Sequence, residues 1–163
     1  MIGCYGIPQR QQGVAVVEFA IVGALALLMI FAVLEISRAI FVANALTEAT
    51  RRGARMAAVC PISDPAIAQV ATFNAPGAGD VSPIVNQLDT SDFVVEYLDG
   101  AGTVIGDPNL EFNLIRYIQV RVTNFEHELL IPFANVTFTM PEFITRLPRE
   151  SLGVPRTGVI TPC

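Results

Sequence analysis

The stretch "VAVVEFAIVGALALLMIFAVL", residues 14–34, decides the architecture of this 163-residue chain. Its only charged residue is Glu18, and about 20 apolar residues are enough for a helix to cross the hydrocarbon core of a bilayer. Residues 14–34 are therefore predicted to form one transmembrane helix. The alternative is a cleaved secretory signal, but the apolar part of such a signal is only about 7–15 residues long, and the helical pattern here continues past Leu34.

Composition limits what the rest of the chain can do. Hydrophobic residues make up 52% of the sequence, and the length allows one domain beside the apolar segment. All ten basic residues are arginine, and fifteen carboxylates give a formal net charge of −5. A nucleic-acid partner needs a basic stripe to displace counterions from phosphates, and the only basic cluster is "TRRGAR" at 50–55. We therefore expect no nucleic-acid partner.

Glu18 has two interpretations. A charged side chain at the centre of a bilayer is unfavourable by about 2.5–3.5 kcal/mol, and by less near the end of a helix, where it can reach the headgroups. The second interpretation depends on Gly13, because cleavage after this residue would turn Val14 into a new N-terminus. Its ammonium would then lie one helical turn from the Glu18 carboxylate. The two charges could pair within one chain or between neighbouring helices and set their register.

These residues carry a family resemblance. The motif "G-VAVVEF", with Gly13, Glu18 and Phe19, resembles the processing site of type IV pilin-like proteins. The resemblance implies that a prepilin peptidase, a membrane aspartic peptidase, cuts between Gly13 and Val14. It also implies that the glutamate at the fifth position of the mature chain guides subunits into a filament.

The branch of the superfamily follows from the surrounding sequence. The short leader, the aromatic residue after Glu18 and the segment "TRRGARMAA" are similar to TadE-like pseudopilins of the tight-adherence (Tad or Flp) pilus. The sister TadF-like pseudopilins share this organisation and stay an alternative. The larger TadG relatives carry an Asp-x-Ser-x-Ser metal site, which is interrupted here by Phe93 in "DTSDF".

The resemblance and the hydropathy pattern predict four segments. Residues 1–13 are a leader, 14–34 the transmembrane part of a long helix, 35–59 its soluble continuation, and 60–163 a periplasmic α+β domain. The expected fold is pilin-like, with the long helix packed on a small antiparallel sheet. The implied partners are the prepilin peptidase, other pilin and pseudopilin subunits, the inner-membrane assembly platform and the lipid bilayer.

The expected location is a single pass through a bacterial inner membrane, with the N-terminus cytoplasmic and the C-terminal domain periplasmic. The arginine count does not favour this orientation, because Arg10 lies on one flank while Arg38, Arg51 and Arg52 lie on the other. The orientation rests instead on the glycine site, which resembles one cut from the cytoplasmic side.

The soluble part of the long helix is predicted to be amphipathic. Arg51, Arg52 and Arg55 lie on its polar surface and are either a solvated face or a possible partner face. The apolar face is expected to comprise Ile36, Ile40, Ala43, Leu46, Thr50, Ala54 and Ala57. Small residues at Ala49, Gly53 and Ala57 suit close packing, here against a sheet. Pro61 is expected to end the helix.

The remaining chain reads as a short helix and several strands. "DPAIAQVATFNA" at 64–75 predicts a helix capped by Asp64, and residues 99–102 predict the turn of a hairpin. Alternation over 115–123 places Ile118, Val120 and Val122 toward the long helix and Arg121 outward. Further strand is expected in "HELLIPF" and "NVTFTM", with an extended tail from Pro141. In total, three or four antiparallel strands should pack on one helix.

Three cysteines are unevenly placed. Cys4 lies in the leader, so processing would leave Cys60 and Cys163 as a pair that an oxidising periplasm could join. Two free thiols are the alternative.

Nothing in the sequence predicts an enzyme, a cofactor or a metal site. His127 in "FEHELL" is the only histidine and is expected in a turn or an exposed strand, where too few ligands converge for zinc. Two functions stay open: a minor pseudopilin needed for pilus biogenesis, adhesion or surface attachment, and an unprocessed, signal-anchored periplasmic binding module in which Glu18 only reaches the headgroups.

Overall fold

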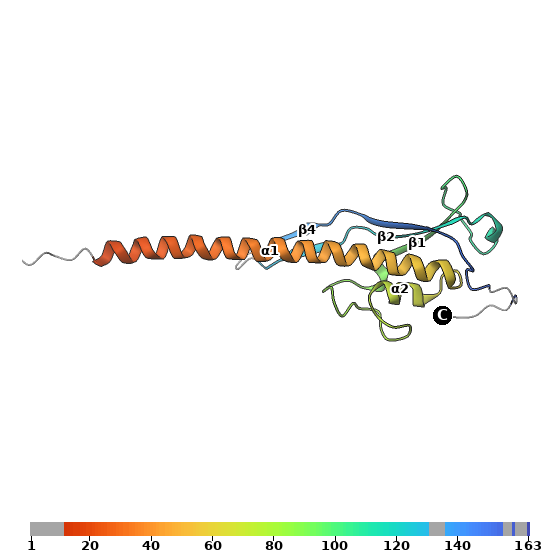
Figure 1. The fold of residues 1–163 in the computed structure, drawn as a ribbon, viewed down its shortest axis with the longest axis horizontal. Helices are drawn as coiled ribbons and strands as arrows, with labels where there is room; N and C mark the ends of the chain where they lie inside the picture. The colour runs from red at the N-terminus through yellow and green to blue at the C-terminus, as the bar shows by residue number, and fades with distance from the viewer. Residues whose placement is uncertain (1–11, 131–135, 155–157, 159–162) are drawn as a thin grey trace, which may run out of the picture. The chain divides into compact units, whose positions relative to one another are not determined.

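The computed structural model describes residues 12–130, 136–154, 158 and 163. Its first element is the helix α1, Gln12–Val59, which continues from the apolar stretch into the folded part of the chain (Figure 1). The chain divides into two compact units, residues 1–38 and 39–163. The soluble continuation of the helix therefore belongs largely to the second unit.

The first unit consists of the apolar part of α1. Large apolar side chains point outward around the whole helix, and Val16, Val22 and Leu28 are each about two-thirds exposed. Within the described residues, α1 is the one helix long and apolar enough to cross a membrane, and its apolar window is not buried against other parts of the protein. A helix in the core of a soluble protein would be covered by its neighbours, so this exposure favours a membrane-spanning segment.

The second unit is built around a three-stranded antiparallel sheet. Its strands are β1 (Phe93–Leu98), β2 (Tyr117–Val122) and β5 (Phe143–Pro148), in the order β1-β2-β5. Ile118, Val120 and Val122 of the central strand are fully buried, as the alternation predicts. The predicted α+β class, a long helix with small antiparallel sheets, is confirmed.

Gly53 lies where three elements meet. A Cβ atom built on Gly53 would lie 3.1 Å from Cβ of Ala71 and 3.2 Å from Cγ1 of Val120. α1 therefore packs between β2 and the short helix α2 (Pro65–Ala71), and the small-residue surface of α1 is used inside the protein. This confirms that a sheet packs against the face containing Gly53.

The predicted apolar face of α1 is correct only in part. Leu46, Thr50, Ala54 and Ala57 are buried, whereas Ile36 and Ile40 are 61% and 57% exposed. The packed face is rotated from the predicted one in this part of the helix, because Ala39 and Val42, on either side of Ile40 in the sequence, are partly buried against the core. Full burial of α1 side chains begins at Ala45.

α2 is shorter than the predicted helix over 64–75. Its N-cap is Asp64, as expected, whose carboxylate accepts a 2.9 Å hydrogen bond from the Ala66 N–H. The helix ends early because Phe73 adopts a left-handed conformation with φ of +69°, which cannot continue a right-handed helix.

The strands depart from the prediction in three ways. β3 (Glu126–Leu129) and β4 (Val136–Thr139) form a separate two-stranded sheet rather than extending the first. The segment after Pro141, expected to be an extended tail, contains the strand β5, which pairs with β2. The turn at 99–102 leads only to an isolated bridge between Leu98 and Val104, while the partner of β1 in the sheet is β2. Short 3-10 helices at Thr90–Asp92 and Phe112–Leu114 complete the described elements.

Candidate processing and assembly site

Gly13 and Val14 lie in the first turn of α1. A Cβ atom added to Gly13 would meet nothing within 4 Å, so the backbone around this peptide bond is open to another molecule. Glycine lowers helix stability by about 0.5–1 kcal/mol relative to alanine, and the ends of helices open most easily. The Gly13–Val14 bond is thus exposed at the start of the helix.

Glu18 and Phe19 follow on the same helix and are both exposed, Phe19 by 80%. In the part of the chain that the structure describes, the Glu18 carboxylate makes no ion pair. Val14 contributes a peptide nitrogen here, so the predicted partner of Glu18, an ammonium on Val14, is not present in the uncleaved chain. The prediction that the two charges pair therefore stays a prediction.

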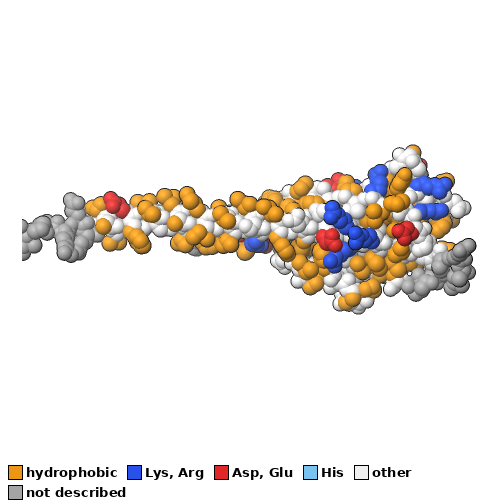
Figure 2. Space-filling view, viewed as in Figure 1, with side chains coloured by type: hydrophobic (Ala, Val, Ile, Leu, Met, Phe, Trp, Pro, Cys, Tyr) orange, Lys and Arg blue, Asp and Glu red, His pale blue; other side chains and the backbone are white. Residues whose placement is uncertain are grey.

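The three arginines of the predicted partner face differ in their surroundings. Arg52 forms an ion pair of 3.1 Å with Glu48, one turn earlier, and its guanidinium lies 4.8 Å from the ring centroid of Phe73. Arg51 and Arg55 are exposed, and among the described residues neither takes part in an ion pair. Figure 2 shows the basic side chains gathered over the C-terminal half of α1. Of these three arginines, Arg52 is the one that forms an ion pair within the described part of the chain.

The C-terminal segment closes the end of α1. The backbone N–H groups of Glu150 and Leu152 donate to the Ala58 carbonyl, and that of Gly153 donates to the Val59 carbonyl at 2.6 Å. The Ser151 hydroxyl donates to the same Val59 oxygen at 3.0 Å. Carbonyls at the end of a helix have no partner within the helix, so residues 150–153 act as its cap.

A disulfide joins Cys60 to Cys163 across a sequence separation of 103 residues. The Cys163 N–H also donates to a carboxylate oxygen of Asp64 at 3.3 Å. The disulfide therefore ties the last residue to the point where α1 ends and α2 begins, which is the arrangement that pairing of these two cysteines predicts.

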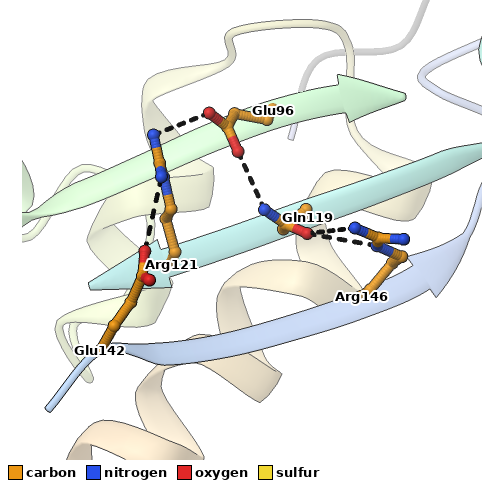
Figure 3. A network of polar contacts seen from close by, with 5 residues as sticks. All are labelled: Glu96, Gln119, Arg121, Glu142 and Arg146. Carbon is orange, nitrogen blue, oxygen red and sulfur yellow. Dashed lines mark hydrogen bonds and ion pairs between the residues drawn. The ribbon is translucent and has the colours of Figure 1, made fainter. Parts of the chain in front are cut away.

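The face of the main sheet away from α1 carries a polar network (Figure 3). Arg121 bridges Glu96 at 2.8 Å and Glu142 at 3.4 Å. Gln119 donates to Glu96 at 2.9 Å and accepts from Arg146 at 2.8 Å. Arg121 lies on the outer face as predicted. Burial of Gln119, which is only 8% exposed beside its charged neighbours, was not predicted.

His127 corrects an expectation. It lies in a strand, but it is only 4% exposed and its ring meets that of Phe138 edge to face, with centroids 5.2 Å apart. The alternation along β3 turns Glu126 outward and His127 inward. The imidazole is therefore shielded from solvent and lies against the ring of Phe138. Among the described residues, no group of three or more potential ligands could hold a metal ion.

Asp89 and Asp92 of the "DTSDF" segment have a local structural role. They form a reciprocal cap on the 3-10 helix: Asp89 accepts from the Ser91 N–H at 2.7 Å, and Asp92 accepts from the Asp89 N–H at 2.9 Å. The hydrogen bonds from Ser91 lower the pKa of Asp89, whereas partial burial raises the pKa of Asp92. These carboxylates are explained by the turn that they stabilise.

Comparisons with known proteins add one positive finding. No curated protein and no solved structure matches the chain. A family model described as TadE-like protein matches residues 13–55, beginning at Gly13 and ending in the arginine cluster. The resemblance read from the sequence is confirmed over this segment: residues 13–55 are similar to the TadE-like family.

Proposed function

We propose that this protein is a minor pseudopilin of a Tad pilus, cleaved after Gly13 and needed for pilus biogenesis, adhesion or surface attachment. The observation that carries the proposal is the accessible Gly13–Val14 bond at the head of an exposed apolar helix, followed at the fifth position by an exposed carboxylate. The TadE-like match over residues 13–55 supports it.

Glu18 is the assembly residue in this proposal, with Phe19 beside it. Cleavage creates an ammonium on Val14, and two opposite charges about 4 Å apart attract by about 4 kcal/mol where the effective dielectric constant is near 20. The pair forms within one chain or between staggered helices. In either case a helix whose carboxylate is neutralised fits the apolar interior of an assembly better than one with a lone charge.

The proposed location is a bacterial inner membrane, with the N-terminus in the cytoplasm and the second unit in the periplasm. The partners are the prepilin peptidase, other pilin and pseudopilin subunits, the assembly platform and the bilayer. The chain acts in assembly rather than as an enzyme, and the disulfide between Cys60 and Cys163 suits an oxidising compartment.

The test is the N-terminal sequence and intact mass of the membrane-extracted chain, made with and without the prepilin peptidase of its own system. We expect a chain that begins at Val14 only when the peptidase is present. Gly13→Ala should block cleavage, whereas Gly23→Ala is the matched control, because both positions lie in α1 and have open space for a Cβ atom.

A chain that begins at Met1 under both conditions would contradict the proposal and favour the unprocessed, signal-anchored binding module. Glu18→Ala separates the two functions again. It should leave membrane insertion and cleavage intact and abolish the protein's contribution to surface pili. Normal piliation by Glu18→Ala cells would refute the assembly role of this carboxylate.

A further inference from the structure

Charge is unevenly distributed over the second unit. From Cys60 to Leu130 the chain carries ten carboxylates and only two arginines, Arg116 and Arg121. The end of α1, in contrast, has three arginines within five residues, at 51, 52 and 55. Opposite charges that lie on different segments of the chain allow one copy to bind a second copy through complementary segments.

Arg51 and Arg55 are the two arginines at the end of α1 that form no ion pair among the described residues. They lie one helical turn apart on α1, both are exposed, and like charges at this spacing weaken a helix. Arg52 is already held by Glu48 and the ring of Phe73. Within the residues that the structure describes, Arg51 and Arg55 have no such partner, so their repulsion is uncompensated in a single copy.

Glu126 and Glu128 offer a matching acidic pair on β3. The residue between them, His127, is buried, which turns both glutamates to the opposite face together with the exposed Thr137 and Thr139 of β4. Glu126 is exposed, whereas Glu128 is half-buried and accepts a 3.3 Å hydrogen bond from the Gln87 side chain, which leaves its second carboxylate oxygen for another partner. Two residues along a strand span about 6.6–6.8 Å, and four residues along a helix rise about 6 Å. The backbone positions of the two glutamates are thus spaced much as those of the two arginines are.

We propose that Arg51 and Arg55 of one copy bind Glu126 and Glu128 of a second copy of this chain. The two surfaces differ, so the contact is head to tail, and its repetition builds an open row of subunits instead of a closed dimer. Each exposed pair is weak, but anchoring in one membrane raises the effective concentration of the copies. The inference rests on the proposed assembly function and adds the surface through which copies meet.

The test uses the full chain in membranes with Cys4→Ser, so that the paired Cys60 and Cys163 are the only other cysteines. Two differently tagged populations are co-expressed, one with Arg55→Cys and the other with Glu126→Cys, and treated with a short bifunctional maleimide. We expect a product that carries both tags. Arg55→Cys with Glu111→Cys is the matched control, because Glu111 is also an exposed carboxylate. Absence of the Arg55–Glu126 product, or equal yield from the control, would overturn the proposal.

Charge reversal gives a second readout that needs no cysteine. Arg51→Glu with Arg55→Glu in both populations should lower co-purification of the two tags by about tenfold. Adding Glu126→Arg and Glu128→Arg should restore it, and an unchanged unfolding midpoint would show that the variants fold. Failure of the fourfold variant to recover would refute the pairing.

The same samples separate this contact from the proposed function, because the N-terminus of each chain is sequenced as well. A chain processed to Val14 whose copies do not cross-link contradicts the contact alone. An unprocessed chain whose copies still cross-link contradicts the pseudopilin function alone. Cross-linking of Arg55→Cys to a different subunit, without any product between copies, would also refute the pairing.

Discussion

Removing the disulfide tests quantitatively how the second unit is held together. Cys60 and Cys163 are 103 residues apart, and closure of a loop of about 100 residues restricts the unfolded chain by about 4.7 kcal/mol in the chain-entropy model. Loss of a native disulfide typically costs about 2–5 kcal/mol. We therefore expect replacement of both cysteines by serine to lower the free energy of unfolding of the second unit by about 2–4.7 kcal/mol.

The assay is urea unfolding of the full chain in detergent micelles, followed by tyrosine fluorescence, since the sequence has three tyrosines and no tryptophan and Tyr97 is buried in the second unit. Cys60→Ser, Cys163→Ser and the reduced wild-type chain all open the same loop and should match the double variant. A loss below about 1 kcal/mol, or a reduced wild-type chain as stable as the oxidised one, would refute the reasoning.

Three further predictions follow from packing, hydrogen bonding and ionisation. Gly53→Leu should destabilise the second unit by about 1–3 kcal/mol through overpacking, measured by the same unfolding assay, whereas Gly23→Leu, which has open space, should leave its midpoint unchanged. Arg146→Ala removes a donor from the buried Gln119 and should cost about 1–2 kcal/mol, against less than about 0.5 kcal/mol for the exposed Arg116→Ala. Burial raises the pKa of Tyr97, so its neutral form favours the folded state, and stability should be complete below about pH 10 and fall as the pH rises through the folded-state pKa. A Tyr97→Phe chain with the same alkaline loss of stability would contradict this assignment.

Much of the fold follows from the sequence because single residue types determine it locally. An apolar run at residues 14–34, with Glu18 as its one charged residue, gives the helix, Pro61 marks its end, and alternation along β2 gives the buried face. The processing motif is equally local, because Gly13 and Glu18 lie within one and a half turns of each other.

The features that the sequence did not predict depend on distant neighbours. Ile40 is exposed although Ala39 and Val42 pack against the core, because the sheet and not the hydrophobic periodicity selects the face of α1 that is covered. The division into two sheets follows a left-handed turn at Asn124, with φ of +57°, between β2 and β3. Burial of Gln119 needs Arg146, which comes from a strand 27 residues later. Each of these is decided by tertiary contacts.

Because residues 150–153 cap α1, the C-terminal end of this helix is completed only by residues that are synthesised late. The hydrogen-bond donors to the carbonyls of Ala58 and Val59 lie more than 90 residues later in the chain, so these bonds form only after the later residues have been synthesised. At about 5–20 residues per second of synthesis, that interval lasts about 5–20 s. During this time Cys60 has left the ribosome without its partner, and in the proposed orientation Cys4 stays on the other side of the membrane. Cys60 then has no wrong cysteine of its own chain to pair with, so a late-arriving C-terminus is compatible with formation of a single disulfide isomer.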